Sequence, residues 1–315
     1  MTRRDSKRHR RDGFTALWLL MVLLLAACTA AGSDGQALQR GDEAFARGDY
    51  TEALAEYRLA LRRDGEDARV LTRAAHAYAQ VGRVEEARDH YRQAIAVDSS
   101  VADLAAADLL RVARTATERR RDGFLAAAAV EAALELRPGV NLTGLARPLA
   151  EHFAGQGQFG RALPYFQKAI GEGIEDPLLV LEMARAYEEL GDCELALIHL
   201  DEIRDDVPAG RRSEVEWRVG NCSFEMGRLA LEEERLEDAL EFFQATIDVG
   251  EPRSRVAEAW FESGEILVSL GRCSEAIEAF RRAQAAALPG GFLIERARDR
   301  IDDLRFGPSG DGEPC

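Results

Sequence analysis

Large and small apolar residues recur along the chain at helical spacings, with polar residues between them. Five stretches start with Gly, continue with a small residue five positions later, and then have apolar residues four and three positions further on. They begin at Gly48, Gly82, Gly157, Gly191 and Gly271. The spacing puts their apolar residues on one face of a helix. That face comprises Ala53, Ala87, Ala162, Ala196 and Ala276, then Tyr57, Tyr91, Phe166, Leu200 and Phe280, then Ala60, Ala94, Ala169, Ile203 and Ala283.

A second helix is expected before each Gly, because a small residue stands seven positions upstream in every stretch. These small residues are Gly41, Ala75, Ala150, Ala184 and Gly264. Trp260 lies four residues before Gly264, and two of the intervals between turn glycines are 34 residues. The pattern resembles the tetratricopeptide repeat (TPR), a pair of antiparallel helices that meet at small residues. The resemblance implies a surface for protein partners.

The predicted fold is all-α: a right-handed α-solenoid of about seven TPR-like helix pairs plus a C-terminal capping helix. Two units are irregular, one from about Ala107 to Pro138 and one from about Arg212, in which Glu234 replaces the turn Gly. The predicted organisation is a signal peptide over 1–27, a lipidated cysteine and tether over 28–36, the solenoid with its cap over 37–305 and a flexible tail over 306–315.

The N-terminus indicates export. Its basic residues Arg3, Arg4, Lys7, Arg8, Arg10 and Arg11 precede an apolar run, Phe14–Ala26, that is too short to span a bilayer. Leu25-Ala26-Ala27-Cys28 resembles a bacterial lipobox, which implies cleavage before Cys28 and lipidation of its thiol. Thr29, where an Asp would resemble an inner-membrane retention signal, favours the outer membrane, facing the periplasm. The alternative is a cleaved signal with an incidental cysteine.

The other cysteines form an even set, Cys193, Cys222, Cys273 and Cys315. Cys193 and Cys222 lie at similar distances on either side of Pro208, so antiparallel helices would bring them together. A bond from Cys273 to Cys315 would pin the tail. Four reduced thiols are the alternative, and no zinc spacing occurs, so neither a metal nor a cofactor is expected.

The chain carries a formal net charge of −15 at pH 7. Nearly all of it falls in residues 151–315, because arginines almost balance the acidic residues of 28–150. This acidity makes nucleic acid an unexpected partner. The sequence lacks a P-loop, a GxSxG elbow, an HExxH motif and a dinucleotide fingerprint, and its histidines are scattered, so no catalytic residue is proposed.

TPR-like solenoids offer a concave groove lined by first helices. By the resemblance, the partner-binding residues are Arg69, Thr72, Arg73, His76, Gln80, Arg111, Arg114, Arg147, Leu181, Glu182, Arg185, Glu188, Glu189, Glu225, Arg228, Phe261, Glu262 and Glu265. Such a groove would be basic near the anchor and acidic at the far end, and it would orient a peptide. Random surface charge is the alternative.

The predicted function is therefore a membrane-anchored scaffold that binds proteins in the bacterial envelope and assists assembly of a complex there. Two alternatives stay open. One is a cell-wall-active enzyme, which would need a clustered polar site in a cleft. The other is a repeat protein for glycans or small ligands, which would need a groove rich in exposed aromatic residues.

Overall fold

The computed structural model describes residues 35–64 and 67–307, and these contain helices and connections but no strand. Contacts between Cα atoms divide the chain into two compact units, Met1–Leu145 and Ala146–Cys315. The sequence predicted one continuous solenoid over 37–305. The boundary falls after residues 137–145, the longest connection between consecutive α-helices in the described chain.

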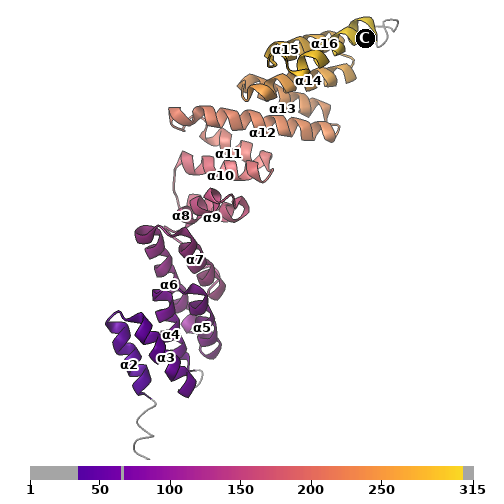
Figure 1. The fold of residues 1–315 in the computed structure, drawn as a ribbon. Helices are drawn as coiled ribbons and strands as arrows, with labels where there is room; N and C mark the ends of the chain where they lie inside the picture. Colours follow the sequence, from indigo (N-terminus) through magenta and orange to yellow (C-terminus); the bar gives the residue numbers. More distant parts are fainter. Residues whose placement is uncertain (1–34, 65–66, 308–315) are drawn as a thin grey trace, which may run out of the picture. The chain divides into compact units, whose positions relative to one another are not determined.

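The described part of the first unit consists of three antiparallel helix pairs (Figure 1). Its helices are α2 (Gln36–Ala46), α3 (Tyr50–Asp64), α4 (Ala68–Gln80), α5 (Val84–Val97), α6 (Val101–Thr115) and α7 (Gly123–Leu136). The pairs are α2 with α3, α4 with α5 and α6 with α7. A π-helical turn, η1 (Ala116–Arg120), follows α6. The third pair starts at Val101, earlier than the predicted Ala107.

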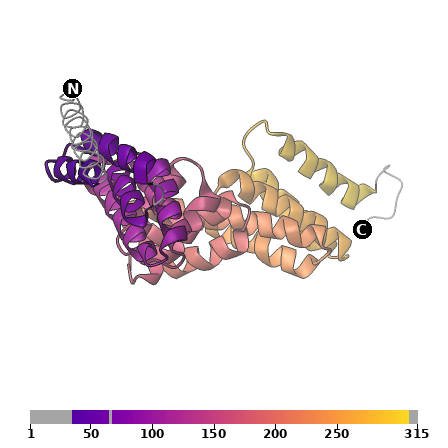
Figure 2. The same ribbon diagram turned by 90° about the horizontal axis from the view of Figure 1, so that it is seen from below.

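Up to residue 307, the second unit consists of four helix pairs followed by a single helix. Its elements are α8 (Ala146–Gly155), α9 (Phe159–Gly171), α10 (Pro177–Glu189), α11 (Cys193–Ile203), the 3-10 turn η2 (Ala209–Arg211), α12 (Arg212–Glu232), α13 (Leu236–Val249), α14 (Arg253–Ser269), α15 (Cys273–Ala286) and α16 (Phe292–Phe306). The single helix α16 packs on α15 and α14. In Figure 2 it is the yellow helix next to the C-terminus. It covers Phe261 and Phe280 with Ala297, Ile301 and Leu304 and so caps the unit.

The predicted packing face forms the core. Every residue named for it is buried, and Tyr57, Tyr91, Phe166 and Phe280 are among the largest fully buried side chains. The small residues let these rings approach the first helices closely. A Cβ atom added to Gly41 would lie 2.5 Å from the Tyr57 ring, and one added to Gly264 would lie 2.6 Å from the Phe280 ring.

Tight turns join the helices of each pair. The turn glycines of the five regular stretches have positive φ, from +68° at Gly271 to +82° at Gly191, a region that glycine reaches without strain. Glu234 occupies the same position between α12 and α13 with φ 60°, as its place in the repeat predicts. In the third pair Arg121 has φ 51° and follows the π-helical turn.

The predicted signal peptide, Cys28 and Cys315 lie outside the described residues. The cap extends to Phe306, one residue beyond the predicted end of the solenoid. Within residues 35–64 and 67–307, no helix combines the length and the apolar character that a bilayer crossing requires.

Candidate functional site

The first helices of the first unit are joined by polar contacts among the predicted groove residues. Arg73 Nε on α4 lies 2.8 Å from a carboxylate oxygen of Asp42 on α2. His76 on α4 places Nδ1 2.9 Å from a carboxylate oxygen of Asp108 on α6. Arg111 on α6 donates to Gln80 on α4 at 3.5 Å. The structure therefore links these residues across consecutive helix pairs.

Asp108 is the buried centre of this arrangement, with 6% of its surface exposed. Its carboxylate accepts a hydrogen bond of 2.7 Å from the Tyr91 hydroxyl, contacts His76 and pairs with Arg111. Burial alone would raise the pKa of Asp108, but the hydrogen bonds from His76 and Tyr91, with the charge of Arg111, hold that pKa below its ordinary value. The carboxylate is therefore ionised and connects α4, α5 and α6.

A cavity of about 380 Å³ opens beside this cluster. Its lining residues are Asp42, Phe45, Ala46, Tyr57, Thr72, Arg73, His76 and Leu104. The Phe45 ring packs on His76 with centroids 4.8 Å apart, and Leu104 is 54% exposed. The predicted residues Thr72, Arg73 and His76 meet here. Phe45 and Leu104 were not predicted from the sequence, although both lie on first helices near the predicted positions.

A series of ion pairs connects the first helices of the second unit, or the residues just before them, with the next helix pair or with α16. Each connects an acidic residue and an arginine that are about one repeat apart in sequence. They are Arg147 with Asp176 at 2.8 Å, Glu182 with Arg211 at 3.4 Å, Glu188 with Arg218, Glu225 with Arg255 at 2.8 Å and Glu265 with Arg300 at 2.6 Å. We call them the inter-repeat ion pairs. Glu188 and Arg218 are the most buried, at 11% and 12% side-chain exposure.

These pairs change the interpretation of the predicted groove. Arg185 lies within 4.0 Å of both Glu182 and Glu189, so further acidic residues of α10 have a cation nearby. Arg69 pairs at 2.9 Å with Asp67, which also accepts a hydrogen bond from the Arg69 backbone at the start of α4. Most predicted charges thus already have a partner within the chain.

Two predicted residues are not on the surface. Phe261 is 2% exposed and packs on Phe280, with ring centroids 5.2 Å apart, and Leu181 is fully buried. Their assignment to the partner-binding groove was wrong. Both positions face neighbouring helices, because a first helix packs on its partner and on the adjacent pairs and leaves only a narrow exposed stripe.

The predicted residues Arg228 and Glu262 line a second cavity, of about 440 Å³, that α12, α14 and α16 share with the connection before α16. Leu288 and Phe292 stand at its edge, 72% and 74% exposed. Burial raises the pKa of Glu262, although nearby Arg296 partly opposes the effect. Arg228 pairs at 3.5 Å with Glu225.

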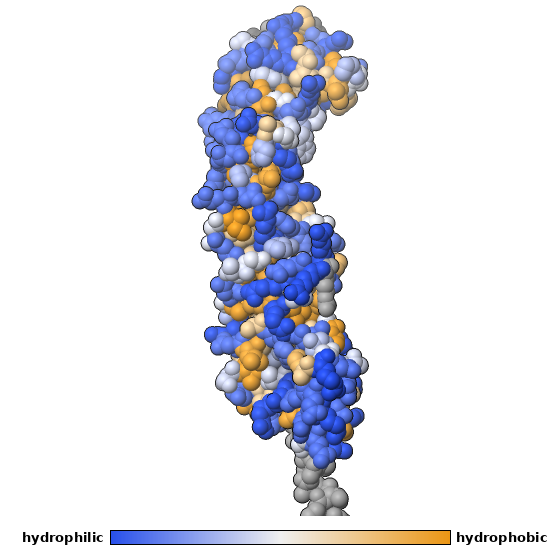
Figure 3. Space-filling model, turned by 90° about the vertical axis from the view of Figure 1, so that its left-hand side faces the viewer, coloured by the Kyte–Doolittle hydropathy of each residue, from blue (hydrophilic) through white to orange (hydrophobic). Residues whose placement is uncertain are grey.

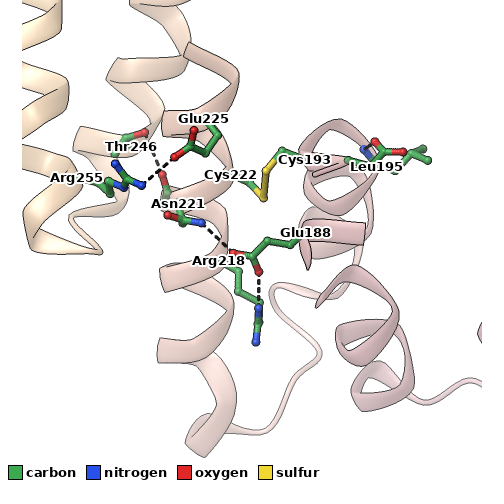
Figure 4. Close-up of a disulfide and its surroundings, with 11 residues drawn as sticks. Glu188, Cys193, Leu195, Arg218, Asn221, Cys222, Glu225, Thr246 and Arg255 are labelled. Atoms are coloured by element: carbon green, nitrogen blue, oxygen red, sulfur yellow. Dashed lines mark hydrogen bonds and ion pairs between the residues drawn. A yellow bond between two sulfur atoms is a disulfide. The ribbon is translucent and has the colours of Figure 1, made fainter. Parts of the chain in front are cut away.

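A disulfide joins Cys193 on α11 to Cys222 on α12, with Cα atoms 5.0 Å apart (Figure 4). This is the pair that the sequence predicts from antiparallel helices. Beside it, Asn221 donates a hydrogen bond of 2.9 Å to Glu188 (Figure 4). Cys273 is also disulfide-bonded, and its predicted partner, Cys315, lies outside the described residues. The bond between Cys193 and Cys222 fixes the second pair of the unit to the third.

On the described surface, few groups of side chains suggest catalysis or metal binding. Within residues 35–64 and 67–307, His, Cys, Asp and Glu side chains form no group of three that could hold a metal. On the face shown in Figure 3, hydrophobic residues form separate spots among hydrophilic ones.

Comparison with protein families identifies the repeat. Models described as "Tetratricopeptide repeat" match residues 44–110, 147–210 and 224–291, which together are more than half of the chain. No curated protein matches the sequence.

Solved structures with a similar fold include three TPR proteins. The C-terminal part of a TPR repeat-containing protein from Cytophaga hutchinsonii is 16% identical with a TM-score of 0.36, over 82% of this chain and 98% of that one. A tetratricopeptide repeat protein from Parabacteroides merdae is 15% identical with a TM-score of 0.30, over 84% and 98%. YrrB, described as a TPR protein with an unusual peptide-binding site, is 19% identical with a TM-score of 0.31, over 77% and 97%.

The helix pairs, the small residues at their crossings and the buried rings agree with the matched family models. TPR repeats imply a scaffold for protein–protein interactions. The chain belongs to the tetratricopeptide repeat family.

Proposed function

We propose that the protein is a lipid-anchored adaptor of the bacterial envelope that binds a protein partner in the first-unit cavity and assists assembly of an envelope complex. The cavity is the observation that carries the proposal. It lies on first helices, holds about 380 Å³, and presents Phe45 and Leu104 between polar groups. A volume of this size accommodates an apolar side chain and the backbone beside it.

The paired charges around the cavity determine what the partner contributes. Arg73 is held by Asp42, and His76 is held by Asp108, so the rim has little free charge. A partner that separated these ion pairs would bind less tightly, because the charges would lose their partners. A partner that covers Phe45 and Leu104 gains affinity from the burial of their apolar surface. The partner segment therefore inserts an apolar residue and hydrogen-bonds through its backbone.

Two features support a place in the envelope. Cys28 follows a lipobox-like sequence, and the seven residues from Thr29 to Gly35 reach at most about 25 Å. The disulfide between Cys193 and Cys222 is of a kind that persists in oxidising compartments outside the cytosol. Lipidation would keep the first unit close to the membrane, because two or three acyl chains give stable anchoring.

Metabolic labelling with an alkyne fatty acid tests the anchor. We expect the wild-type protein to incorporate the label and to fractionate with membranes, and Cys28→Ala to do neither. Cys273→Ala is a control, since that cysteine lies in the folded repeats and should not change labelling. Wild-type protein that is cleaved and exported without any acyl label would contradict the proposed anchor.

A further inference from the structure

The second unit has a larger groove on its second-helix side. It holds about 710 Å³, with α13 and α15 as its walls and α14 as its floor. The α13 wall consists of Leu240, Glu241, Gln244, Ala245 and Asp248, and the α15 wall extends to Arg282. Concave TPR surfaces are lined by first helices, so this groove is separate from the proposed partner site in the first unit.

The floor of the groove is apolar and contains an aromatic ring. Trp260 and Leu267 lie there, next to the small residues Ala245 and Ser263. The Arg282 guanidinium lies 4.8 Å from the Trp260 ring centroid and pairs at 3.0 Å with Glu278. The groove therefore already accepts a cation stacked on the indole and paired with a carboxylate of the wall.

Both walls carry carboxylates. On α13, Glu241 and Asp248 are exposed and seven residues apart, so they lie on one face, about 10 Å from each other along the helix. Within the described chain, neither of them forms an ion pair with a cation. Glu275 and Glu278 stand on the α15 wall and are paired with arginines of their own helix or its cap, Arg272 and Arg282.

We propose that this groove binds a basic amphipathic helix of a partner protein. Its apolar face would cover the partly exposed Trp260, Leu240 and Ala245, and its Lys or Arg side chains would pair with Glu241 and Asp248. The distance between the two carboxylates corresponds to two turns of the incoming helix. The acidic character of residues 151–315 attracts such a segment from a distance and repels a second copy of this unit.

Binding of two designed peptides tests the proposal. One is an amphipathic helix with Lys on its polar face, and the other has Glu at every Lys position; neither contains Trp. With purified protein carrying Trp217→Phe, Trp260 is the only tryptophan after residue 28, so its emission reports on the groove. We expect the Lys peptide to change this emission and to bind at least about tenfold more tightly than the Glu peptide.

Charge-reversal variants test whether the Lys peptide binds at Glu241 and Asp248. We expect the double variant Glu241→Lys, Asp248→Lys to weaken binding of the Lys peptide by about tenfold or more. The matched control Asp299→Lys, Asp302→Lys changes the net charge equally on α16, outside the groove, and should weaken binding by less than about threefold. The neutral pair Glu241→Gln, Asp248→Asn should give an intermediate loss and provides a second test if the reversed pair folds poorly.

Three results would overturn the proposal. Equal affinity for both peptides would show that the groove does not select basic segments. Equal effects of the two charge-reversal pairs would show that binding depends only on the general acidity of the unit. A protein dimer that Glu241→Lys and Asp248→Lys dissociate would assign the groove to a second copy instead.

Discussion

At the scale of single residues, glycines decide how closely helices and connections approach. Gly41 and Gly264 are predicted from the repeat, because a large apolar residue recurs opposite the small position in each of the five regular stretches. Gly220 in α12 is a different case. A Cβ atom there would lie 1.7 Å from the carbonyl oxygen of Glu251, a backbone contact that the repeat does not specify. Its importance was therefore visible only in the structure.

Gly220→Ala should lower the free energy of unfolding by about 2 kcal/mol or more, because a backbone carbonyl cannot move aside as a flexible side chain can. The control is Gly160→Ala in α9, where an added Cβ meets nothing within 4 Å and helix propensity favours Ala by up to about 1 kcal/mol. Urea unfolding followed by circular dichroism measures both. Equal stability of the two variants would contradict the close approach of the Glu251 carbonyl to Gly220.

Glu234→Gly should raise the free energy of unfolding by about 1 kcal/mol, because φ 60° is strained for Glu and accessible to Gly. Glu233→Gly is the matched control one residue earlier. Glu233 has φ −87°, so glycine brings no relief there and costs chain entropy. A thermal melt of each variant gives the comparison, and stabilisation of both or of neither would rule out relief of strain as the cause.

At the scale of helices, the disulfide holds α11 against α12. Cys193 and Cys222 are both buried and are 29 residues apart in sequence. Loop closure over that distance predicts a loss of about 3 kcal/mol when the bond is absent. The paired variant Cys193→Ala, Cys222→Ala should show this loss in urea unfolding without reductant. If adding reductant lowered the stability of that variant as much as that of the wild type, the effect would come from another bond.

Asp108 connects three helices of the first unit and makes its stability depend on pH. Because the folded-state pKa is lowered, the carboxylate stabilises the fold above the ordinary carboxyl pKa of about 4 and loses this effect as the pH falls below it. Asp108→Asn should lower the free energy of unfolding by about 1 to 3 kcal/mol at pH 7 and by less in acid.

The matched control for this prediction is Asp103→Asn on the same helix. Asp103 pairs with Arg137, but its side chain is 80% exposed, so its removal should cost little at any pH. Unfolding curves at pH 7 and below pH 4 compare the variants. If the free energies of unfolding of Asp108→Asn and the wild type differed by the same amount at both pH values, this would contradict a role for the ionisation of Asp108.

The helices and their packing face could be predicted because one apolar pattern recurs in the five regular stretches. The charged face could not be predicted in the same way, since its contacts depend on which side chains meet between neighbouring pairs. Glu188 and Arg218, or Glu225 and Arg255, are 30 residues apart, and this spacing was the available signal. The cavity beside Phe45 depends on side chains from α2, α3, α4 and α6 together, which no single repeat contains.

At the scale of the whole molecule, two repeat units offer different surfaces. The first unit has an apolar cavity on its first helices, and the second has an acidic groove on its second helices. The two surfaces differ in chemistry, because Phe45 and Leu104 line the cavity whereas Glu241 and Asp248 line the groove. An adaptor with both could hold two segments at once, and linked binding would raise the overall affinity.

Photo-crosslinking in living cells tests the central claim, capture of a protein partner in the first-unit cavity at the membrane, most directly. A benzophenone amino acid at Leu104, 54% exposed on the cavity edge, is compared with one at Val97, 55% exposed on α5 and outside the cavity. We predict one dominant adduct with an envelope protein from Leu104, absent from Val97 and lost in the Cys28→Ala background. The same adducts from both positions, or none from Leu104, would contradict it.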